Sequence, residues 1–333
     1  MGVIVGIDQG SSGTRAVISA LDGRLVGFGT GLGACHHFDG MEAAMQGVKE
    51  AVGQALAQAQ LSNEEIDLIY GGLTGADWPE EYGMLREAVG ALHLCDRVHI
   101  TNDSIVAMRG GTEKSYGAIL VAGTGANCAV RAPDGREFLY HYYHDEHLQG
   151  GSALGASAVK AVMRAETGRG PATSLRPRLL AMMGVDTVDD LVRKVLEGWQ
   201  AHFMDFKDLA PIVFEEAYAG DPVASGIIHD FGKGSAELVT AALRRFEMTD
   251  VEIEVVLSGS IFKGVGSLLT DTLKVEIHRV APKARLVNAR YEPVVGAVLL
   301  GFDLLGIQIE GGVKANIALT AKQLGLERDC FPL

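Results

Sequence analysis

Apolar stretches separated by glycine-rich bends occur twice along the chain in the same order. Residues 3–23 contain an apolar run, a bend of Gly, Ser and Thr, a second apolar run and the turn Asp22-Gly23. Residues 117–135 repeat this order and end with Asp134-Gly135. Each copy predicts a β-hairpin, and the small residues at its bend let backbone N–H groups approach an anion closely. Two such bends facing each other suggest a polyphosphate held between two halves of the protein.

Outside the hairpins, helical periodicity alternates with short apolar runs. This pattern predicts strands at 66–73, 97–101 and 254–257, and helices at 41–60, from Pro79 to about Leu92, from Ser104, over most of 152–246, from about Lys263 and finally from about Pro293. Gly110-Gly111 interrupts the pattern and marks a boundary between two domains. The alternation favours an α/β architecture, in which ligands bind at the carboxyl ends of the strands.

Composition narrows the classes of function. The chain has 333 residues, which is enough for two domains with their own cores. Its formal net charge of −13, with no basic tail and no long apolar run, argues against nucleic acid and membrane partners. The four cysteines are scattered without a Cys-x-x-Cys pair, and no signal peptide precedes the first strand. We therefore expect a cytoplasmic protein with no structural zinc and no disulfide framework.

The two bends are candidates for binding phosphate. Gly10-Ser11-Ser12-Gly13-Thr14 offers backbone donors and hydroxyl groups, and Gly123-Thr124-Gly125 with Asn127 does so in the second hairpin. Asp8 stands at the end of the first strand, where it could hold Mg²⁺ through water. Each bend taken alone is equally explained as a plain hairpin turn, but the pairing of the two favours phosphate.

Two further strand ends carry candidate residues. Asp103 follows a predicted strand, and a carboxylate there can accept the proton of a hydroxyl group that attacks phosphorus. The structural alternative is that Asp103 is the N-cap of the following helix, for which Ser104 is the other candidate. Ser258-Gly259-Ser260 follows another apolar strand. This turn either packs bare backbone against a base and ribose or simply joins a strand to a helix.

Histidines gather at two places in the sequence. Residues 140–152 contain three histidines and two carboxylates, namely His141, His144, His147, Asp145 and Glu146. Their spacing matches no standard zinc pattern, so we favour a substrate-facing loop that enters a helix at Ser152 over a metal site. His36-His37 is expected on an exposed loop.

In their order and spacing these elements resemble the sugar kinase/Hsp70/actin superfamily, and within it the BadF/BadG/BcrA/BcrD ATPase family, which includes N-acetylglucosamine kinases. The similar stretches are the first phosphate motif Asp8–Arg15, the sugar-side stretch Gly72–Glu81, Thr101-Asn102-Asp103, the second phosphate motif Gly123–Asn127, the adenosine motif Leu257–Phe262 and the helix start Glu292–Ala297. The resemblance covers roughly residues 3–306.

The resemblance implies an α/β fold of two duplicated ribonuclease H-like (actin-like ATPase) domains with a cleft between them. The first domain would span 1–112 and be joined by a C-terminal helix at about 292–333. The second would span 113–291 and contain a helical insertion.

The same resemblance implies ATP and Mg²⁺ as cofactors, Asp103 as the catalytic base and Asp8 as the residue that holds the metal through water. The implied nucleotide-binding residues are Gly10, Ser11, Ser12, Gly13, Thr14, Arg15, Gly123, Thr124, Gly125, Ser258, Gly259, Ser260 and Lys263. The implied substrate-binding residues are Thr74, Gly75, Asp77, Asn102, Asp103, Asn127, Asp145, Glu146 and Gln149.

One position departs from the family. Its kinases typically carry Gly-Asp-Glu-Gly-Ser, whereas this chain has Leu148-Gln149-Gly150-Gly151-Ser152. The carboxylate that helps to bind an N-acetylhexosamine hydroxyl is therefore replaced by Gln149, or supplied by Asp145 or Glu146. We accordingly expect a preference for a hexose or amino sugar other than N-acetylglucosamine.

The resulting hypothesis is a homodimeric, ATP-dependent kinase that phosphorylates a hydroxyl group of a small sugar or amino sugar. One alternative is an ATPase that activates a 2-hydroxyacyl-CoA dehydratase. That branch needs cysteines in the second domain, and this chain offers only Cys128 and Cys330 there. Another alternative is a non-catalytic sugar sensor or repressor, but no helix-turn-helix precedes the first strand and the charge is unfavourable for DNA.

Overall fold

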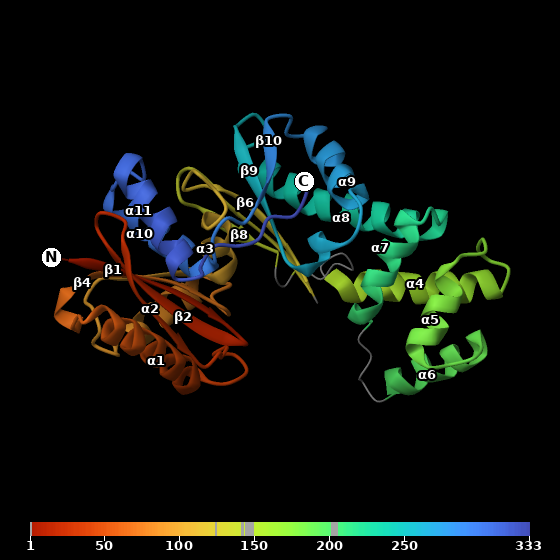
Figure 1. Cartoon of the computed structure of the whole chain (residues 1–333), viewed down its shortest axis with the longest axis horizontal. Coiled ribbons are helices and arrows are strands. Elements are labelled where there is room, and N and C mark those ends of the chain that lie inside the picture. Colours follow the sequence, from red (N-terminus) through yellow and green to blue (C-terminus); the bar gives the residue numbers. More distant parts are fainter. Residues whose placement is uncertain (1, 124, 141–142, 144–149, 201–205) are drawn as a thin grey trace.

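Two five-stranded sheets with the same strand order form the centre of the molecule (Figure 1). The computed structural model describes residues 2–123, 125–140, 143, 150–200 and 206–333. The first sheet has the order β3-β2-β1-β4-β5. The second, read from its opposite edge, has the matching order β8-β7-β6-β9-β10. Because both place an antiparallel three-stranded unit beside two parallel strands, the second sheet repeats the topology of the first.

The strands of the first sheet are β1 (Val3–Gly10), β2 (Gly13–Ala20), β3 (Leu25–Gly31), β4 (Ile66–Leu73) and β5 (Val98–Asn102). Those of the second are β6 (Gly117–Ala122), β7 (Ala126–Arg131), β8 (Glu137–Leu139), β9 (Ile253–Ser258) and β10 (Ala284–Asn288). Both predicted hairpins are confirmed. The sequence analysis missed the third antiparallel strand of each unit, β3 and β8, and also the parallel strand β10.

Helices cover both faces of the first sheet. Two of them, α1 (Met41–Ala59) and α2 (Pro79–Gly90), enclose one apolar core with it, and α10 (Pro293–Leu305) and α11 (Gly311–Gln323) enclose another on the opposite face. Nine residues of α10 are buried, so this helix is apolar on nearly all sides. The close approach of α10 depends on Gly296, where a Cβ would lie 1.9 Å from the carbonyl oxygen of Val106.

The second sheet packs against α8 (Pro222–Arg245) and α9 (Leu268–His278) on one face. Its other face meets α3 (Asp103–Arg109) and α10, so the two halves share a small apolar cluster. The remaining helices, α4 (Gly150–Glu166), α5 (Leu175–Met183), α6 (Val188–Gln200) and α7 (Ala210–Tyr218), extend away from the first sheet (Figure 1). The predicted helical stretch between residues 152 and 246 is therefore present.

Two predicted helices differ from the structure. The helix expected from about Lys263 begins only at Leu268, because Ser260–Lys263 forms one turn of 3₁₀ helix and Gly266 has a φ of +85°. The helix expected from about Pro293 is not the last one. It ends at Leu305, where Gly306 adopts a left-handed φ of 70°, and α11 follows.

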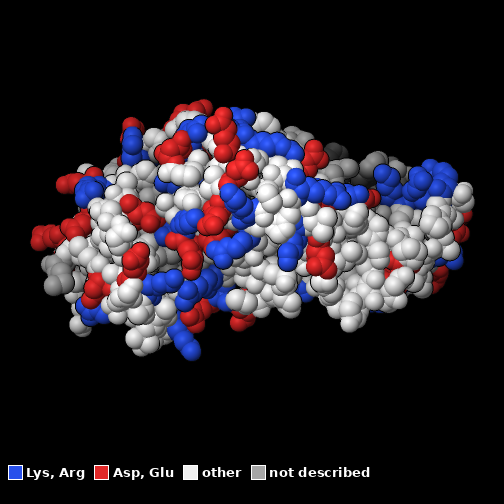
Figure 2. Space-filling model, turned by 90° about the horizontal axis from the view of Figure 1, so that it is seen from above, with Lys and Arg blue, Asp and Glu red and all other residues white. Residues whose placement is uncertain are grey.

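One face of the surface shows how the charged side chains are distributed (Figure 2). On the face shown in Figure 2, acidic and basic side chains are interspersed over the left half, and neither sign forms one continuous field there. No described helix combines the length and apolar character needed to cross a lipid bilayer.

Candidate active site

The candidate residues lie where strands of both sheets end. Strands β1, β4 and β5 run parallel in the first sheet, and β6 and β9 run parallel in the second. In the first sheet, β1 ends at the first bend, β4 at the sugar-side stretch and β5 just before Asp103. In the second sheet, β6 ends at the second bend and β9 at the adenosine turn. The geometry thus brings together segments that are up to 250 residues apart in the sequence. Some of the predicted residues lie outside the described part of the chain, namely Thr124, Asp145, Glu146, Gln149 and the three histidines of 141–147.

The first bend exposes its serines and turns its threonine inward. Ser11 and Ser12 are exposed, whereas Thr14 is buried and its hydroxyl group donates to the carbonyl oxygen of Leu32 at 2.6 Å. The buried amide of Gln9 donates to the Thr14 hydroxyl at 3.1 Å and to the carbonyl oxygen of Ala44 at 2.8 Å. The Thr14 side chain therefore fixes the bend from behind, and the groups left to face a ligand come from 10–13.

Asp8 is held beside two cations and a second carboxylate. Burial and the nearby charge of Asp103 raise the pKa of Asp8 to about 7, although Arg15 opposes the shift. The Arg15 guanidinium donates to Glu292, at the start of α10, with an N···O distance of 2.6 Å. The carboxylate oxygens of Asp8 and Asp103 are hard donors of the kind that Mg²⁺ prefers.

Asp103 is not the cap of its helix, which corrects one alternative from the sequence. The side chain of Asn102 caps α3 by accepting from the backbone N–H of Ser104 at 2.8 Å. Asp103 is the first residue of the helix and is partly exposed. Its carboxylate is therefore not the group that caps the helix.

The second bend is packed tightly between two neighbours. The N–H of Gly151, at the start of α4, donates to the carbonyl oxygen of Gly123 at 2.8 Å, and a Cβ on Gly150 would lie 2.4 Å from the carbonyl oxygen of Gly125. On the other side, a Cβ on Gly259 would lie 2.1 Å from the carbonyl oxygen of Ala122. Backbone-on-backbone contact of this kind needs glycine.

A cavity of about 650 Å³ opens beside this bend. The predicted residues Gly123, Ser260 and Lys263 line it. Pro211 and Phe214 of α7 line it as well, and the sequence analysis did not find them because a proline and a phenylalanine in a helix carry no distinctive signal. The size and the largely apolar wall suit a nucleoside.

The predicted sugar-side residues form a hydrogen-bonded chain across the two sheets. The Asn102 amide donates to the Asp77 carboxylate at 2.8 Å, and the Asn127 amide donates to the Ser104 hydroxyl at 3.3 Å. The backbone N–H of Thr74 donates to the carbonyl oxygen of Gln9 at 2.8 Å. The side-chain oxygen of Asn127 is buried and has no hydrogen-bond partner among the described residues. An unsatisfied buried acceptor at a strand end is a place for a ligand donor.

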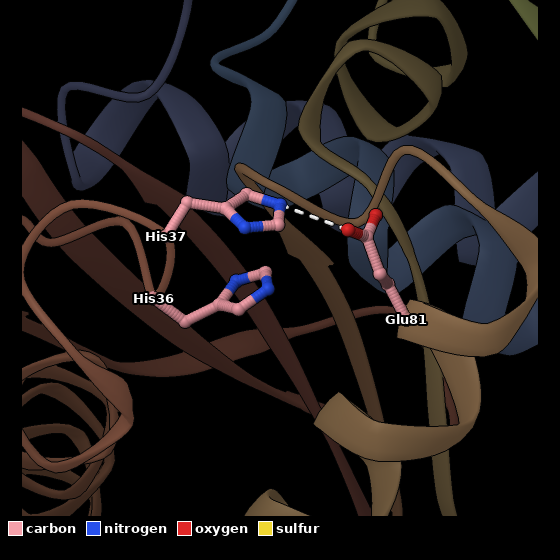
Figure 3. Close-up of side chains that lie close together, drawn as sticks. All are labelled: His36, His37 and Glu81. Atoms are coloured by element: carbon pink, nitrogen blue, oxygen red, sulfur yellow. Dashed lines mark ion pairs between the residues drawn. The ribbon is translucent and has the colours of Figure 1, made fainter.

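The loop after β3 reaches the same region (Figure 3). The His37 ring nitrogen lies 2.8 Å from one carboxylate oxygen of Glu81, whose other oxygen accepts from the backbone N–H groups of Asp77 and Trp78 at 2.8 and 2.9 Å. The rings of His36 and His37 lie 4.0 Å apart between centroids and are tilted by 35°, and both ring nitrogens of His36 are buried. The loop is exposed at His37, as expected, and His37 also pairs with Glu81 in the first turn of α2.

The geometry of Gly259 yields a prediction about stability. Gly259 has a φ of +115°, and Gly259→Ala would add both backbone strain and a clash with Ala122. We expect a loss of at least about 1–3 kcal/mol in the free energy of unfolding, measured by urea denaturation. Gly53→Ala is the control, because Gly53 lies in α1 with open space around it, and this change should be neutral or slightly stabilising. Equal stability of Gly259→Ala and wild type would show that the turn is not constrained.

Known proteins share this architecture. The profile of the BadF/BadG/BcrA/BcrD ATPase family matches residues 5–301. The chain belongs to this family.

Three relatives illustrate the range of the family. An N-acetylmuramic acid/N-acetylglucosamine kinase from Clostridium acetobutylicum is 24% identical over 90% of this chain and 98% of its own length. A glucosamine kinase from Vibrio cholerae is 27% identical over 67% of this chain and 74% of its own length. A crystal structure of a candidate N-acetylglucosamine kinase from Chromobacterium violaceum superposes with a TM-score of 0.60 at 23% identity, covering 90% of this chain and 99% of the other.

Proposed function

We propose that this protein is an ATP-dependent carbohydrate kinase that phosphorylates a hydroxyl group of a small sugar or amino sugar. The observation that carries the proposal is the convergence of Asp8, Asp103 and Asn127 at adjoining strand ends, beside a nucleoside-sized cavity. Phosphoryl transfer needs a group that positions the attacking hydroxyl and a cation at the phosphates, and these two carboxylates can serve both roles, while the Asn127 amide oxygen can accept from a sugar hydroxyl. The kinase names of the curated relatives support the same reaction.

Each residue has a role in this reaction. The backbone N–H groups of the two bends bind phosphate oxygens, and Ser260 and Lys263 border the nucleoside. Asp103 orients the sugar hydroxyl and accepts its proton, while Asn127 and Asp77 position the sugar ring. Asp8 is the residue that would hold Mg²⁺ through water, and the bound ion would neutralise charge on the phosphates.

The structure gives little support to the alternative of a dehydratase activator. An iron–sulfur cluster needs thiolate ligands that are accessible. Cys128 is buried in β7, and burial raises the pKa of its thiol to about 12, so it stays protonated. Cys330 is exposed but stands alone in the C-terminal segment. An anaerobically purified protein without iron absorbance would agree with this assignment.

The direct test is ATP consumption by the purified protein with a panel of hexoses and amino sugars. Phosphorylation of at least one sugar, detected by mass spectrometry of the product, is expected. The same panel on Gln149→Asp examines the sugar preference, because a carboxylate binds a hydroxyl group about twice as strongly as a neutral amide does. We expect this change to favour N-acetylglucosamine. ATP hydrolysis that no sugar stimulates would contradict the kinase proposal.

Asn127 allows the sugar side to be tested separately. Asn127→Ala removes the buried amide oxygen and the bond to Ser104. We expect the KM for the sugar to rise by about tenfold or more, as for loss of one buried hydrogen bond, while the KM for MgATP changes little. Asn63→Ala is the control, because Asn63 is exposed in the turn just before the amino end of β4, at the other end of this strand from the site. Equal changes in both KM values would contradict a role confined to the sugar.

A further inference from the structure

The last part of the chain lies beyond the family match and connects the two sheets. The family profile ends at residue 301, within α10, so α11 and the C-terminal segment (residues 324–333) are not described by it. Helix α11 is fixed to the first sheet, where Thr320 accepts from the backbone N–H of Leu25 at 2.9 Å and Asn316 donates to the carbonyl oxygen of Asp22 at 2.8 Å. One end of this addition is therefore anchored on the first half.

The C-terminal segment then crosses to the second sheet (Figure 1). The N–H of Glu292 donates to the carbonyl oxygen of Leu326 at 2.9 Å. Further along, Phe331 stacks on Phe262 with 5.8 Å between ring centroids, and the side chain of Asn288 donates to the carbonyl oxygen of Phe331 at 2.8 Å. Phe262 belongs to the 3₁₀ turn of the adenosine motif, so the segment is packed directly against that motif.

Between these anchors, the side chain of Arg328 lies beside Ser258 and Glu292. One guanidinium nitrogen donates to the Ser258 hydroxyl at 2.8 Å, and Nε donates to Glu292 at 3.0 Å. Ser258 ends β9, where Val255 and Leu257 pack into the core of the second half and Val256 faces the cluster shared with the first half. Because side chains alternate along a strand, Ser258 and the arginine bonded to it lie on the side of the second sheet that faces the first half.

Two guanidinium groups meet at one carboxylate in this region. Glu292 accepts from both Arg15 and Arg328, so the two cations share this carboxylate. Arg328 is close enough to Asp8 to oppose the rise in the pKa of that carboxyl group. A cavity of about 300 Å³ lies beside it, lined also by Ser260, Lys263, Glu327 and Asp329. Two of the five guanidinium N–H groups are used in the two bonds, and the others can donate to a phosphate.

We propose that the C-terminal segment completes the nucleotide site and that Arg328 binds the polyphosphate of the nucleoside triphosphate. This inference rests on the proposed function, since it assigns a further residue to the same nucleotide site. The guanidinium is held by Ser258 of the second half and by Glu292, which is itself paired with Arg15 of the first half. The cavity beside Arg328 shares Ser260 and Lys263 with the cavity that suits the nucleoside, so the two adjoin.

The test compares three variants of the full-length protein. Arg328→Gln should raise the KM and the Kd for MgATP by about tenfold or more, the effect of losing one charge-assisted hydrogen bond, and leave the sugar KM within about twofold. Arg328→Lys keeps the charge but not the planar fork, and should recover part of the affinity. Arg290→Gln is the control, because its side chain lies over Tyr291 outside the 300 Å³ cavity and its backbone bond to Arg328 is kept.

A purely structural role for Arg328 predicts a different outcome. In that case the thermal midpoint without ligand would fall, and the KM values for ATP and sugar would change together or not at all, which would overturn the proposal. If Arg328→Gln does not fold, Arg328→Lys and Phe331→Ala replace it, and unchanged MgATP affinity in both would equally overturn it. Calorimetric binding of MgATP needs no sugar, so an Arg328 effect on binding is measurable even if no sugar is phosphorylated and the kinase proposal fails.

Discussion

Asp103→Asn should lower kcat by about two orders of magnitude or more, the usual scale for loss of a general base. The variant should still fold and bind MgATP, because Asn102 and not Asp103 caps α3. Asn cannot accept the hydroxyl proton, and it retains nearly the same shape. The measurement is steady-state kinetics with a coupled assay, together with calorimetric binding of MgATP.

Asp96→Asn is the matched control for this change. Asp96 is exposed just before β5, so replacing its carboxylate tests the general effect of one lost negative charge. Its kcat should equal that of the wild type. A kcat for Asp103→Asn close to wild type would reduce Asp103 to an ordinary acidic residue in the first turn of a helix, where the helix dipole favours a negative charge.

Asp8→Asn should lose activity and gain stability in the absence of ligand. Activity should fall by about 10²-fold or more, because the residue proposed to hold the cation at the phosphates is removed. Burial and Asp103 raise the pKa of Asp8 to about 7 from its usual 3.8, so ionised Asp8 destabilises the ligand-free fold. Asn carries no charge and avoids this cost.

The effect on stability depends on pH with a defined sign. Between about pH 4 and 7 the folded protein holds a proton on Asp8 that the unfolded chain has released, so the stability of the wild type falls as the pH rises through this range. The gain in thermal midpoint for Asp8→Asn should therefore be largest at pH 8 and small near pH 4. For the wild type, kcat/KM for MgATP should rise with pH up to about 7. A stability gain that is independent of pH would contradict this account.

The two Asp predictions are coupled. Asp103 raises the pKa of Asp8, so Asp103→Asn should move the pH dependence of Mg²⁺ or MgATP binding to lower pH. The shift is measured by calorimetry of MgATP binding across pH 5–8, with Asp96→Asn as the control. An unchanged pH profile would show that the two carboxylates do not interact.

Local patterns in the sequence were sufficient for much of the fold. The strand at Ile66–Leu73 and the helix at Met41–Ala59 agree with the prediction to within a residue, because each is a long, uniform pattern of apolar positions. Strands β8 and β10 were missed because they are only three and five residues long and their faces are partly exposed. The helix expected from about Lys263 is present as α9, but its predicted start was wrong because glycines at 264 and 266 delay it to Leu268.

The sequence by itself determined the repeated hairpins, the α/β class and the position of Asp8, Asp103 and Ser258 at strand ends. These features depend on the spacing of apolar residues and on the backbone freedom of glycine, and both have effects that extend over only a few residues. Only the tertiary structure decided that Thr14 points inward, that Asn102 caps α3, and that Arg15 and Arg328 meet at Glu292. Such contacts join residues that are as many as 277 positions apart, and their geometry is set by how helices and sheets pack. Because charge–charge energies and desolvation depend on that packing, the raised pKa of Asp8 also follows from the folded protein alone.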